Sequence, residues 1–371
     1  MAKSAIDMGI LEVGNPAAAF VSDGLISDIT EYLDTGSYIL NAAVSGSIFG
    51  GYPRGIVTAF AGEPATGKTY LCMDAVSSFH QRYENGIVVW FDTEQAVEST
   101  DFNSRPGIDP NRIKVQPVAT VEQFRTEITK MLVNYLKLPE SQQFPLLFIL
   151  DSLGNLSTNK ETTDIETGND KRDMTKPQLI KGAFRTITLK LGMARATLLV
   201  TNHVYSEIGV MFPTPQIAGG SGLKYCSSNI IMLGKAKEKD GTDVIGNQIR
   251  CKMYKSRKTK ENKIVSSRIF YDTGIDRYFG LLDLAEKYGI ATKVGNKYQF
   301  EGSDKAFFEK AIYKEPEKYF TDEIMTVLDF VAHKEYMYGN AFEMWCEAKG
   351  YDPEKDRPVP LETKAVEKEE K

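Results

Sequence analysis

Eight consecutive residues, Gly62-Glu63-Pro64-Ala65-Thr66-Gly67-Lys68-Thr69, have the spacing of a phosphate-binding loop. The apolar residues 55–61 before them are β-branched enough for a buried strand. Residues 70–83 after them carry apolar side chains at the spacing of a helix. So short a pattern can arise by chance, but the same pattern between a strand and a helix seldom does. The sequence therefore predicts a strand–turn–helix unit that binds phosphate.

The residue types in this loop fit the chemistry of a nucleoside triphosphate. Gly62 and Gly67 let the backbone curl so that its amides point at phosphate oxygens, and the positive end of the next helix adds to the attraction. Lys68 would neutralise the terminal phosphates, and the Thr69 hydroxyl would hold Mg2+. An ordinary glycine turn before a helix would not need Lys and Thr directly after Gly67. We therefore expect residues 62–69, and Tyr70 after them, to bind ATP.

Composition limits the classes of protein to which the chain can belong. With 371 residues and 42% hydrophobic content, it can bury a large core. The net charge of -5 means that nucleic-acid binding would need a local basic patch. Cys72, Cys226, Cys251 and Cys346 form no CxxC pair, which argues against zinc and against a disulfide framework. The longest apolar run, 144–150, is too short to span a membrane, so we expect a cytoplasmic protein.

The order of the expected elements indicates an α/β fold with a mostly parallel central sheet flanked by helices. Apolar strands are expected at 86–92, 146–150 and 197–200, and helices at 121–138 and 178–193. Strands that are apolar throughout and alternate with amphipathic helices are typical of a parallel sheet covered on both faces. Further strands, compatible with antiparallel pairing, would close the sheet at 229–233, 248–254 and 264–271.

The two ends of the chain differ in pattern from the middle. Residues 1–34 read as an extended lead with a short helix at 27–33, which would dock on the main body or on a neighbouring copy, or else be disordered. After about Asp276 the pattern changes to short helices at 281–288, 303–312 and 322–332, with a hairpin near Gly295-Asn296. The expected division is an N-terminal segment 1–34, a core 35–275, a small α+β C-terminal domain 276–356, and a solvated tail 357–371.

Three of the expected strands lead into polar residues that would meet at one edge, because ligands bind at the carboxyl ends of parallel strands. Asp151 would hold the Mg2+ shell, whereas a lone aspartate in this position is otherwise a helix cap. Glu94 suits a general base that orients water, the alternative being a capping carboxylate or a surface ion pair. His203 would donate a hydrogen bond to the terminal phosphate, or else be a buried histidine with its own partners.

Two loops and one basic stretch are candidates for DNA contact. The loop 205–222 is bounded by glycines, and its Met211 and Phe212 side chains would wedge between bases or stack on them. The loop 157–177 is long and polar, and an ordinary mobile loop is the alternative for both. Residues 250–268 hold eight basic residues against Glu261, which suits phosphates or a solvated face. The DNA-binding candidates are Lys160, Lys171, Arg172, Lys176, Val210, Met211, Phe212, Gly219 and Gly220.

In combination, these motifs resemble those of a RecA-family recombinase, and they are most similar to the UvsX recombinases of T-even-type bacteriophages. The resemblance runs from about Ile39 to Leu284. It rests on the loop 62–69, on Phe91-Asp92-Thr93-Glu94, on residues 148–156, on residues 209–212 with Gly219-Gly220, on Lys255-Ser256-Arg257, and on Gly280-Leu281-Leu282-Asp283.

The resemblance implies a role for each matching residue of the ATP site. Lys68 and Thr69 would bind ATP and Mg2+, Asp151 would be the Walker B acid, and Glu94 would be the catalytic base. His203 falls where bacterial relatives have a glutamine that senses the γ-phosphate. Phe102 lies near the position of an aromatic residue that stacks on adenine, although its spacing from Glu94 differs slightly from the bacterial pattern.

The resemblance also implies DNA and subunit contacts. The loops 157–177 and 204–222 match the two DNA-binding loops of the family. Lys255 and Arg257 match the basic pair that reaches the γ-phosphate of the neighbouring subunit. Two features depart from the family pattern: the tail lacks a strongly acidic run, which argues against autoinhibition by the tail, and the N-terminal polymerisation arm matches only loosely.

The resemblance therefore implies a RecA-type P-loop ATPase core and a Mg2+-dependent, DNA-dependent ATPase. It would exchange DNA strands in recombination, recombination-dependent replication and repair. We expect a helical homo-oligomer on single-stranded DNA, with ATP bound between protomers. Its expected partners are homologous duplex DNA, a recombination mediator and a single-stranded DNA-binding protein. We expect it in the cytoplasm, which is the cytoplasm of the host cell if a phage encodes the protein.

Two other functions are compatible with the same motifs. A ring helicase motor would need a helical N-terminal domain, which residues 1–34 are too few to supply. A mediator that binds DNA and ATP without strand exchange would not need a general base, and Glu94 argues against it.

Overall fold

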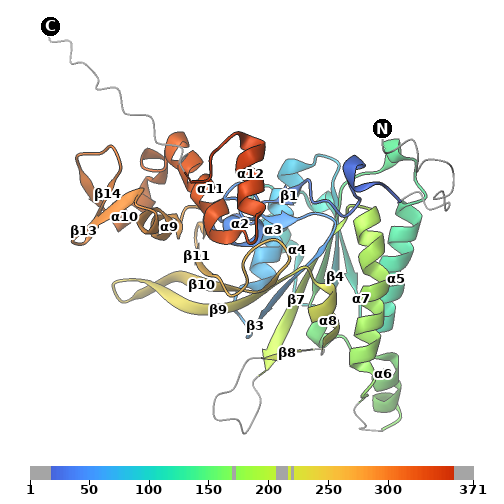
Figure 1. Ribbon diagram of the computed structural model, residues 1–371. Coiled ribbons are helices and arrows are strands. Elements are labelled where there is room, and N and C mark those ends of the chain that lie inside the picture. The colour runs from blue at the N-terminus through green and yellow to red at the C-terminus, as the bar shows by residue number, and fades with distance from the viewer. Residues whose placement is uncertain (1–17, 169–172, 206–215, 219–220, 355–371) are drawn as a thin grey trace, which may run out of the picture.

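The computed structural model describes residues 18–168, 173–205, 216–218 and 221–354 (Figure 1). Parallel strands form one side of its main sheet, and mostly antiparallel strands form the other side. The parallel strands are β3 (Val57–Gly62), β4 (Ile87–Asp92), β5 (Ile113–Pro117), β6 (Leu146–Asp151) and β7 (Thr197–Tyr205). The others are β8 (Gln216–Ile217), β9 (Asn229–Asp240), β10 (Asp243–Ser256), β11 (Ile264–Phe270) and β12 (Gly274–Asp276).

Among the described residues these ten strands form one sheet in the order β12-β11-β10-β9-β3-β7-β6-β4-β5, with β8 paired to β7. Strands β3, β4, β5, β6 and β7 pair in parallel, and β9 runs parallel to β3. The predicted α/β fold with a mostly parallel sheet is therefore confirmed. The strands β9 and β10 continue well beyond the predicted segments, because their outer halves pair with each other as a hairpin.

Helices cover both faces of the sheet. They are α2 (Tyr38–Ser45), α3 (Lys68–Arg82), α4 (Ser99–Asn103), α5 (Val121–Tyr135), α6 (Asn159–Glu166), α7 (Lys176–Met193) and α8 (Ser221–Cys226). Short 3-10 helices occupy Val21–Asp23, Pro110–Arg112, Glu140–Gln142 and Leu153–Asn155. No helix in the described part of the chain combines the length and the hydropathy needed to cross a membrane.

Two apolar layers result from the alternation of side chains along the strands. Trp90 and Ile149 point to the face covered by α2 and α3, whereas Phe91 and Phe148 point to the face covered by α5 and α7. Figure 1 shows α5 and α7 side by side on this second face. Because both faces are buried, the strands are apolar throughout, as the sequence predicts for a parallel sheet.

The register of the sheet shows which residues lie at each end of the parallel strands. Thr58 of β3 pairs with Asn229 of β9, which pairs with Ser256 of β10. At the carboxyl end of β3, Gly62 pairs with Leu233 of β9. The end of β10 therefore lies at the amino ends of the parallel strands, and the phosphate-binding loop lies at their carboxyl ends.

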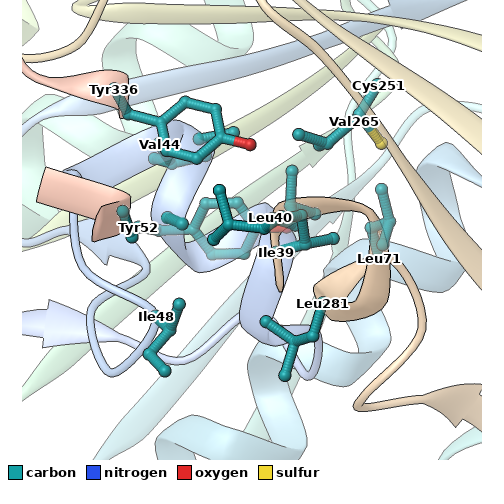
Figure 2. Close-up of a cluster of buried hydrophobic side chains, with 14 of the residues drawn as sticks. Ile39, Leu40, Val44, Ile48, Tyr52, Leu71, Cys251, Val265, Leu281 and Tyr336 are labelled. Carbon is teal, nitrogen blue, oxygen red and sulfur yellow. The ribbon is translucent and has the colours of Figure 1, made fainter. Parts of the chain in front are cut away.

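The C-terminal region, residues 281–349, packs on the same apolar core. It contains α9 (Leu281–Lys287), β13 (Ala291–Val294), β14 (Lys297–Phe300), β15 (Ala306–Phe308), α10 (Glu309–Lys314), a 3-10 helix (Pro316–Lys318), α11 (Asp322–Tyr336) and α12 (Ala341–Lys349). Figure 2 shows Tyr336 of α11 and Leu281 of α9 in one buried cluster with Leu40 and Val44 of α2. The region is thus joined to the sheet by continuous packing.

Three local predictions are wrong. The helix expected at 27–33 is absent, because Tyr32–Leu33 forms a strand, β1, that pairs with β2 (Tyr52–Pro53). The helix expected at 303–312 begins only at Glu309, since Ala306–Phe308 pairs with β14. The loop expected at 157–177 contains α6, whose start is fixed by a capping box between Thr158 and Glu161.

Candidate functional site

The loop 62–69 joins β3 to α3 with a backbone that glycine alone accommodates at two points. Gly67 has a φ of 88°, in the left-handed region that favours glycine. A Cβ at Gly62 would lie 2.7 Å from the Thr66 hydroxyl oxygen and 2.8 Å from the Leu233 carbonyl oxygen. The loop therefore curls tightly in front of the amino end of α3, where free backbone amides and the helix dipole attract anions.

Lys68 is buried at the first position of α3, with its side chain directed back over the loop. Its Nζ donates to the Gly62 carbonyl at 3.0 Å and to the Glu63 carbonyl at 2.8 Å. Burial lowers the pKa of Lys68, and the carboxylates of Asp151 and Glu94 counteract that shift. The ammonium group is thus held at the loop by contacts that a phosphate group, as a stronger acceptor, can replace.

Thr69 and Asp151 bring hard oxygen ligands to the same edge of the sheet. The Thr69 hydroxyl donates to Asp151 Oδ2 at 2.8 Å, and the buried Thr201 hydroxyl donates to Asp151 Oδ1. Burial raises the pKa of Asp151 despite these two hydrogen bonds. The described residues contain no group of three or more His, Cys, Asp or Glu side chains that could hold a metal ion. One hydroxyl and one carboxylate fit Mg2+ that is also bound by phosphate oxygens and water.

Glu94 follows β4 and is oriented by three neighbours. Its Oε1 accepts a hydrogen bond from the Ser152 hydroxyl at 2.6 Å and lies 3.2 Å from His203 Nε2. Asp92 Oδ1 accepts from the backbone amides of Glu94 and Gln95 at 3.0 and 2.8 Å, which fixes the turn. Glu94 is therefore a positioned carboxylate with part of its surface open to solvent, as a general base requires.

A cavity of about 240 Å³ joins these groups. Its lining residues come from the loop, α3 and three strand ends: Pro64, Ala65, Gly67, Lys68, Thr69, Tyr70, Glu94, Asp151 and His203. The structure thus brings together most of the residues predicted for ATP and Mg2+ binding. Ser152 and Thr201 are not among the predicted site residues, although both lie directly beside predicted strand ends.

Phe102 does not lie in this cavity. Its side chain is only 5% exposed and packs edge-on against Trp90 in the core, with ring centroids 5.5 Å apart. A ring in this position has no free face for adenine, so the structure does not support the predicted stacking role. The aromatic residue that lines the cavity is Tyr70, which is partly buried and carries the Arg105 guanidinium 3.9 Å from its ring centroid.

His203 connects the cavity to the loop that follows β7. Its carbonyl accepts from the Ala218 amide at 3.0 Å, and Asn202 Nδ2 donates to the Ala218 carbonyl at 2.8 Å. The turn after β6 also approaches closely, since a Cβ at Gly154 would lie 3.0 Å from His203 Cδ2. The histidine beside Glu94 therefore contacts the turn that precedes the predicted loop 157–177, and it directly precedes the loop 204–222.

The predicted DNA-binding residues lie only partly within the described structure. Lys160 of α6 is exposed, with its Nζ 3.9 Å from Asp173, and Lys176 lies 3.9 Å from Glu161. The others lie outside the described residues: Lys171, Arg172, Val210, Met211, Phe212, Gly219 and Gly220. Their role stays a prediction.

Lys255 and Arg257 lie near the amino ends of the parallel strands, whereas the loop 62–69 lies at their carboxyl ends. Lys255 Nζ donates to the carbonyls of Lys224 and Ser227, at 2.5 and 2.8 Å, and so caps the end of α8. Arg257 is exposed, and its guanidinium has no hydrogen bond or ion pair among the described residues. Thr58 and Gly62 are four residues apart along β3, so at about 3.3 Å per residue the two ends of the strands lie about 13 Å apart.

The basic stretch 250–268 is only partly available to phosphates. Arg268 forms ion pairs with Glu238 at 3.3 Å and with Asp276 at 2.7 Å. Lys263 pairs with Glu335 at 2.6 Å. Much of the predicted charge therefore serves internal contacts, which leaves Arg257 and Lys258 among its exposed members.

Comparisons with known proteins agree with this geometry. The family model of the RecA N-terminal domain matches residues 12–276. The recombination and repair protein of Enterobacteria phage T4 is 33% identical over 258 residues, which cover 70% of this chain and 64%, less than two thirds, of the phage protein. Protein RecA of a Nocardioides species is 31% identical, and that of Kineococcus radiotolerans 32%, each over 73% of this chain and 74% of the relative. The predicted resemblance, including that to recombinases of T-even phages, is confirmed, and the chain belongs to the RecA family.

Proposed function

We propose that this protein is an ATP-driven recombinase that forms helical filaments on single-stranded DNA and exchanges strands with homologous duplex DNA. It would act in homologous recombination, recombination-dependent replication and repair. The observation that carries the proposal is the convergence of Lys68, Asp151 and Glu94 in one cavity at the sheet edge where the loop 204–222 begins. The names of the phage T4 and bacterial relatives support it.

The residues of the cavity divide the work of ATP hydrolysis. The loop amides and Lys68 would hold the β- and γ-phosphates, and Thr69 and Asp151 would hold Mg2+, which when bound neutralises phosphate charge. Glu94 would accept a proton from a water molecule as the water oxygen attacks the γ-phosphorus and the bond to the bridging oxygen breaks. The hydrogen bond from Ser152 at 2.6 Å holds that carboxylate in place.

Bound DNA would change the rate of ATP hydrolysis through His203. The imidazole lies 3.2 Å from Glu94, and its backbone carbonyl accepts a hydrogen bond from Ala218 in the loop 204–222. DNA bound to this loop would fix the end of β7 and thereby the position of Glu94. The proposed outcome is an ATPase that DNA stimulates.

A neighbouring protomer would complete the site. Arg257 is exposed near the amino ends of the parallel strands, whereas its own phosphate-binding loop lies at their carboxyl ends. It can therefore approach a γ-phosphate only in another copy of the chain. Lys255 would have to leave the carbonyls of α8 to act in the same way. A head-to-tail contact of this kind repeats without closing and generates a helix.

The remaining parts have proposed roles in assembly. Residues 1–34 would form the polymerisation segment, 35–275 the ATPase core, 276–356 a C-terminal domain and 357–371 a flexible tail. A recombination mediator and a single-stranded DNA-binding protein are the expected partners, and the cytoplasm, of the host if a phage encodes the protein, is the expected location.

The test is the ATPase rate with and without single-stranded DNA, measured beside electron micrographs of the same mixture. We expect DNA to stimulate hydrolysis by the wild type and helical filaments to form. Lys68→Ala should abolish turnover, whereas Lys114→Ala, which removes an exposed lysine on β5, should leave it unchanged. Closed rings in the micrographs would favour a helicase motor, and wild-type turnover by Lys68→Ala would refute the site.

A further inference from the structure

The turn that carries Arg257 is held by the C-terminal region. We call residues 257–263, between β10 and β11, the arginine turn. The Tyr338 hydroxyl donates to the Arg257 carbonyl, and the Lys260 amide donates to the Tyr336 carbonyl at 2.6 Å. Thr259 and Met337 form an isolated antiparallel bridge. The backbone of the turn is therefore paired with the chain that leaves α11.

Side chains add a second set of contacts between the arginine turn and α11. Lys260 Nζ donates to the carbonyls of Lys334 and Glu335 at 3.0 and 3.1 Å, which caps the carboxyl end of the helix. Lys263 Nζ lies 2.6 Å from Glu335 Oε1. Glu335 also binds Lys287 and Tyr288 of the C-terminal region, at 2.7 and 2.8 Å. The middle and the far end of the turn are thus bound to α11, and its first residue is bound to Tyr338, just beyond that helix.

Helix α11 is itself fixed to the core. The carboxylate of Asp329 accepts hydrogen bonds from the Ser47 hydroxyl at 2.6 Å and from the Ile48 amide at 2.9 Å. Met337 packs against Gly46, where a Cβ would lie 2.8 Å from Met337 Cγ. Tyr336 lies in the buried cluster with Val44 (Figure 2). A shift of α11 would therefore move the arginine turn with it.

We propose that Tyr338 and Lys260 are positioning residues that set the direction of Arg257 toward the ATP of the neighbouring protomer. This inference rests on the proposed function, in which Arg257 acts on that ATP. The geometry favours positioning over mere stability for two reasons. Tyr338 is 48% exposed, so its hydroxyl contributes little to core packing, and its hydrogen bond ends on the backbone of the residue that carries the guanidinium. The C-terminal region thereby controls hydrolysis without touching the nucleotide.

The experiment measures DNA-stimulated ATP hydrolysis by Tyr338→Phe and Lys260→Gln. Loss of one such hydrogen bond should lower kcat about three- to tenfold, while KM for ATP stays within about twofold, because the protomer's own loop is untouched. The matched control is Tyr319→Phe, a tyrosine of the same region whose hydroxyl has no hydrogen-bond partner among the described residues, and it should keep the wild-type kcat. Equal rates for Tyr338→Phe and the wild type would overturn the inference.

Mixed filaments separate positioning from a folding defect. A Glu94→Gln protomer has an inactive site of its own but still presents an intact Arg257. In an excess of this protomer, each Tyr338→Phe site faces an intact arginine, so its kcat should return to the wild-type value. Absence of rescue at every ratio would show that Tyr338→Phe damages its own site, and the inference would fail.

Arg257→Ala distinguishes this inference from the proposed function. Wild-type hydrolysis by Arg257→Ala would mean that the shared ATP site itself is wrong. Strong loss in Arg257→Ala with no loss in Tyr338→Phe would leave the shared site intact and refute only the positioning role.

Discussion

Replacement of Arg257 by alanine should separate catalysis in a filament from catalysis within one chain. The register of β3, β9 and β10 puts Arg257 about 13 Å or more from its own phosphate-binding loop. Across that distance in water, one charge changes the energy of another by about 0.3 kcal/mol, which alters a rate by less than about twofold. An arginine that touches the γ-phosphate in the transition state contributes about a thousandfold or more. The two possibilities differ by far more than any experimental error.

The assay is steady-state ATP hydrolysis on single-stranded DNA, with nucleotide affinity measured separately by equilibrium binding. We expect Arg257→Ala to lower kcat about a thousandfold and to change ATP affinity by less than about fivefold, because the loop 62–69 is intact. Arg250→Ala is the matched control, since it removes an exposed arginine from β10, the strand that leads into the turn of Arg257, and it should keep the wild-type rate. A loss of less than about twofold in Arg257→Ala would show that Arg257 does not touch the γ-phosphate of a neighbouring protomer.

Three further predictions concern other parts of the molecule. Ser152→Ala removes the hydrogen bond to Glu94 and should lower kcat about tenfold or more with an unchanged KM; an unchanged kcat would mean that Glu94 needs no such support. Burial would raise the pKa of Glu335, but hydrogen bonds from Lys263, Lys287 and Tyr288 outweigh it and lower that pKa to about 2. A carboxyl group whose pKa is lowered on folding stabilises the fold fully above about pH 4.5, and the effect is lost as the pH falls toward about 2. Glu335→Gln should therefore lower the free energy of unfolding in urea by about 1–2 kcal/mol at pH 7 and by about half as much at pH 3; an equal loss at both pH values would contradict the ion cluster. Phe102→Leu should lower the free energy of unfolding by about 1–2 kcal/mol and leave KM for ATP within about twofold, whereas a raised KM with unchanged stability would restore the role of Phe102 in base stacking.

Local sequence determined the phosphate-binding loop and the central strands. The spacing of Gly62, Gly67, Lys68 and Thr69 is a property of eight neighbouring residues, so it can be read without knowledge of the fold. The strands of the parallel sheet are buried on both faces, and their uninterrupted apolar runs predict them well. The ends of these strands then place Asp151 and Glu94 at one edge, as the structure confirms.

Other features depend on contacts between distant parts of the chain and were not predictable in the same way. Strand β1 forms because Tyr32 and Leu33 meet β2, and nothing in residues 27–33 shows that pairing. Ser152 and Thr201 support Glu94 and Asp151 only through the register of β4, β6 and β7. The internal partners of Lys255 likewise become visible only when α8 is placed beside β10. The capping box of α6, by contrast, is a local pattern: Thr158 followed three residues later by Glu161 predicts a helix start from sequence alone.

The most direct test of the shared ATP site is a structure of the filament on single-stranded DNA with a non-hydrolysable ATP analogue. We expect the Arg257 guanidinium of one protomer to lie within hydrogen-bond distance, about 2.7–3.2 Å, of a γ-phosphate oxygen held by Lys68 of the next protomer. An Arg257 side chain that faces solvent or its own chain in that filament, with no other protomer's phosphate within reach, would contradict it.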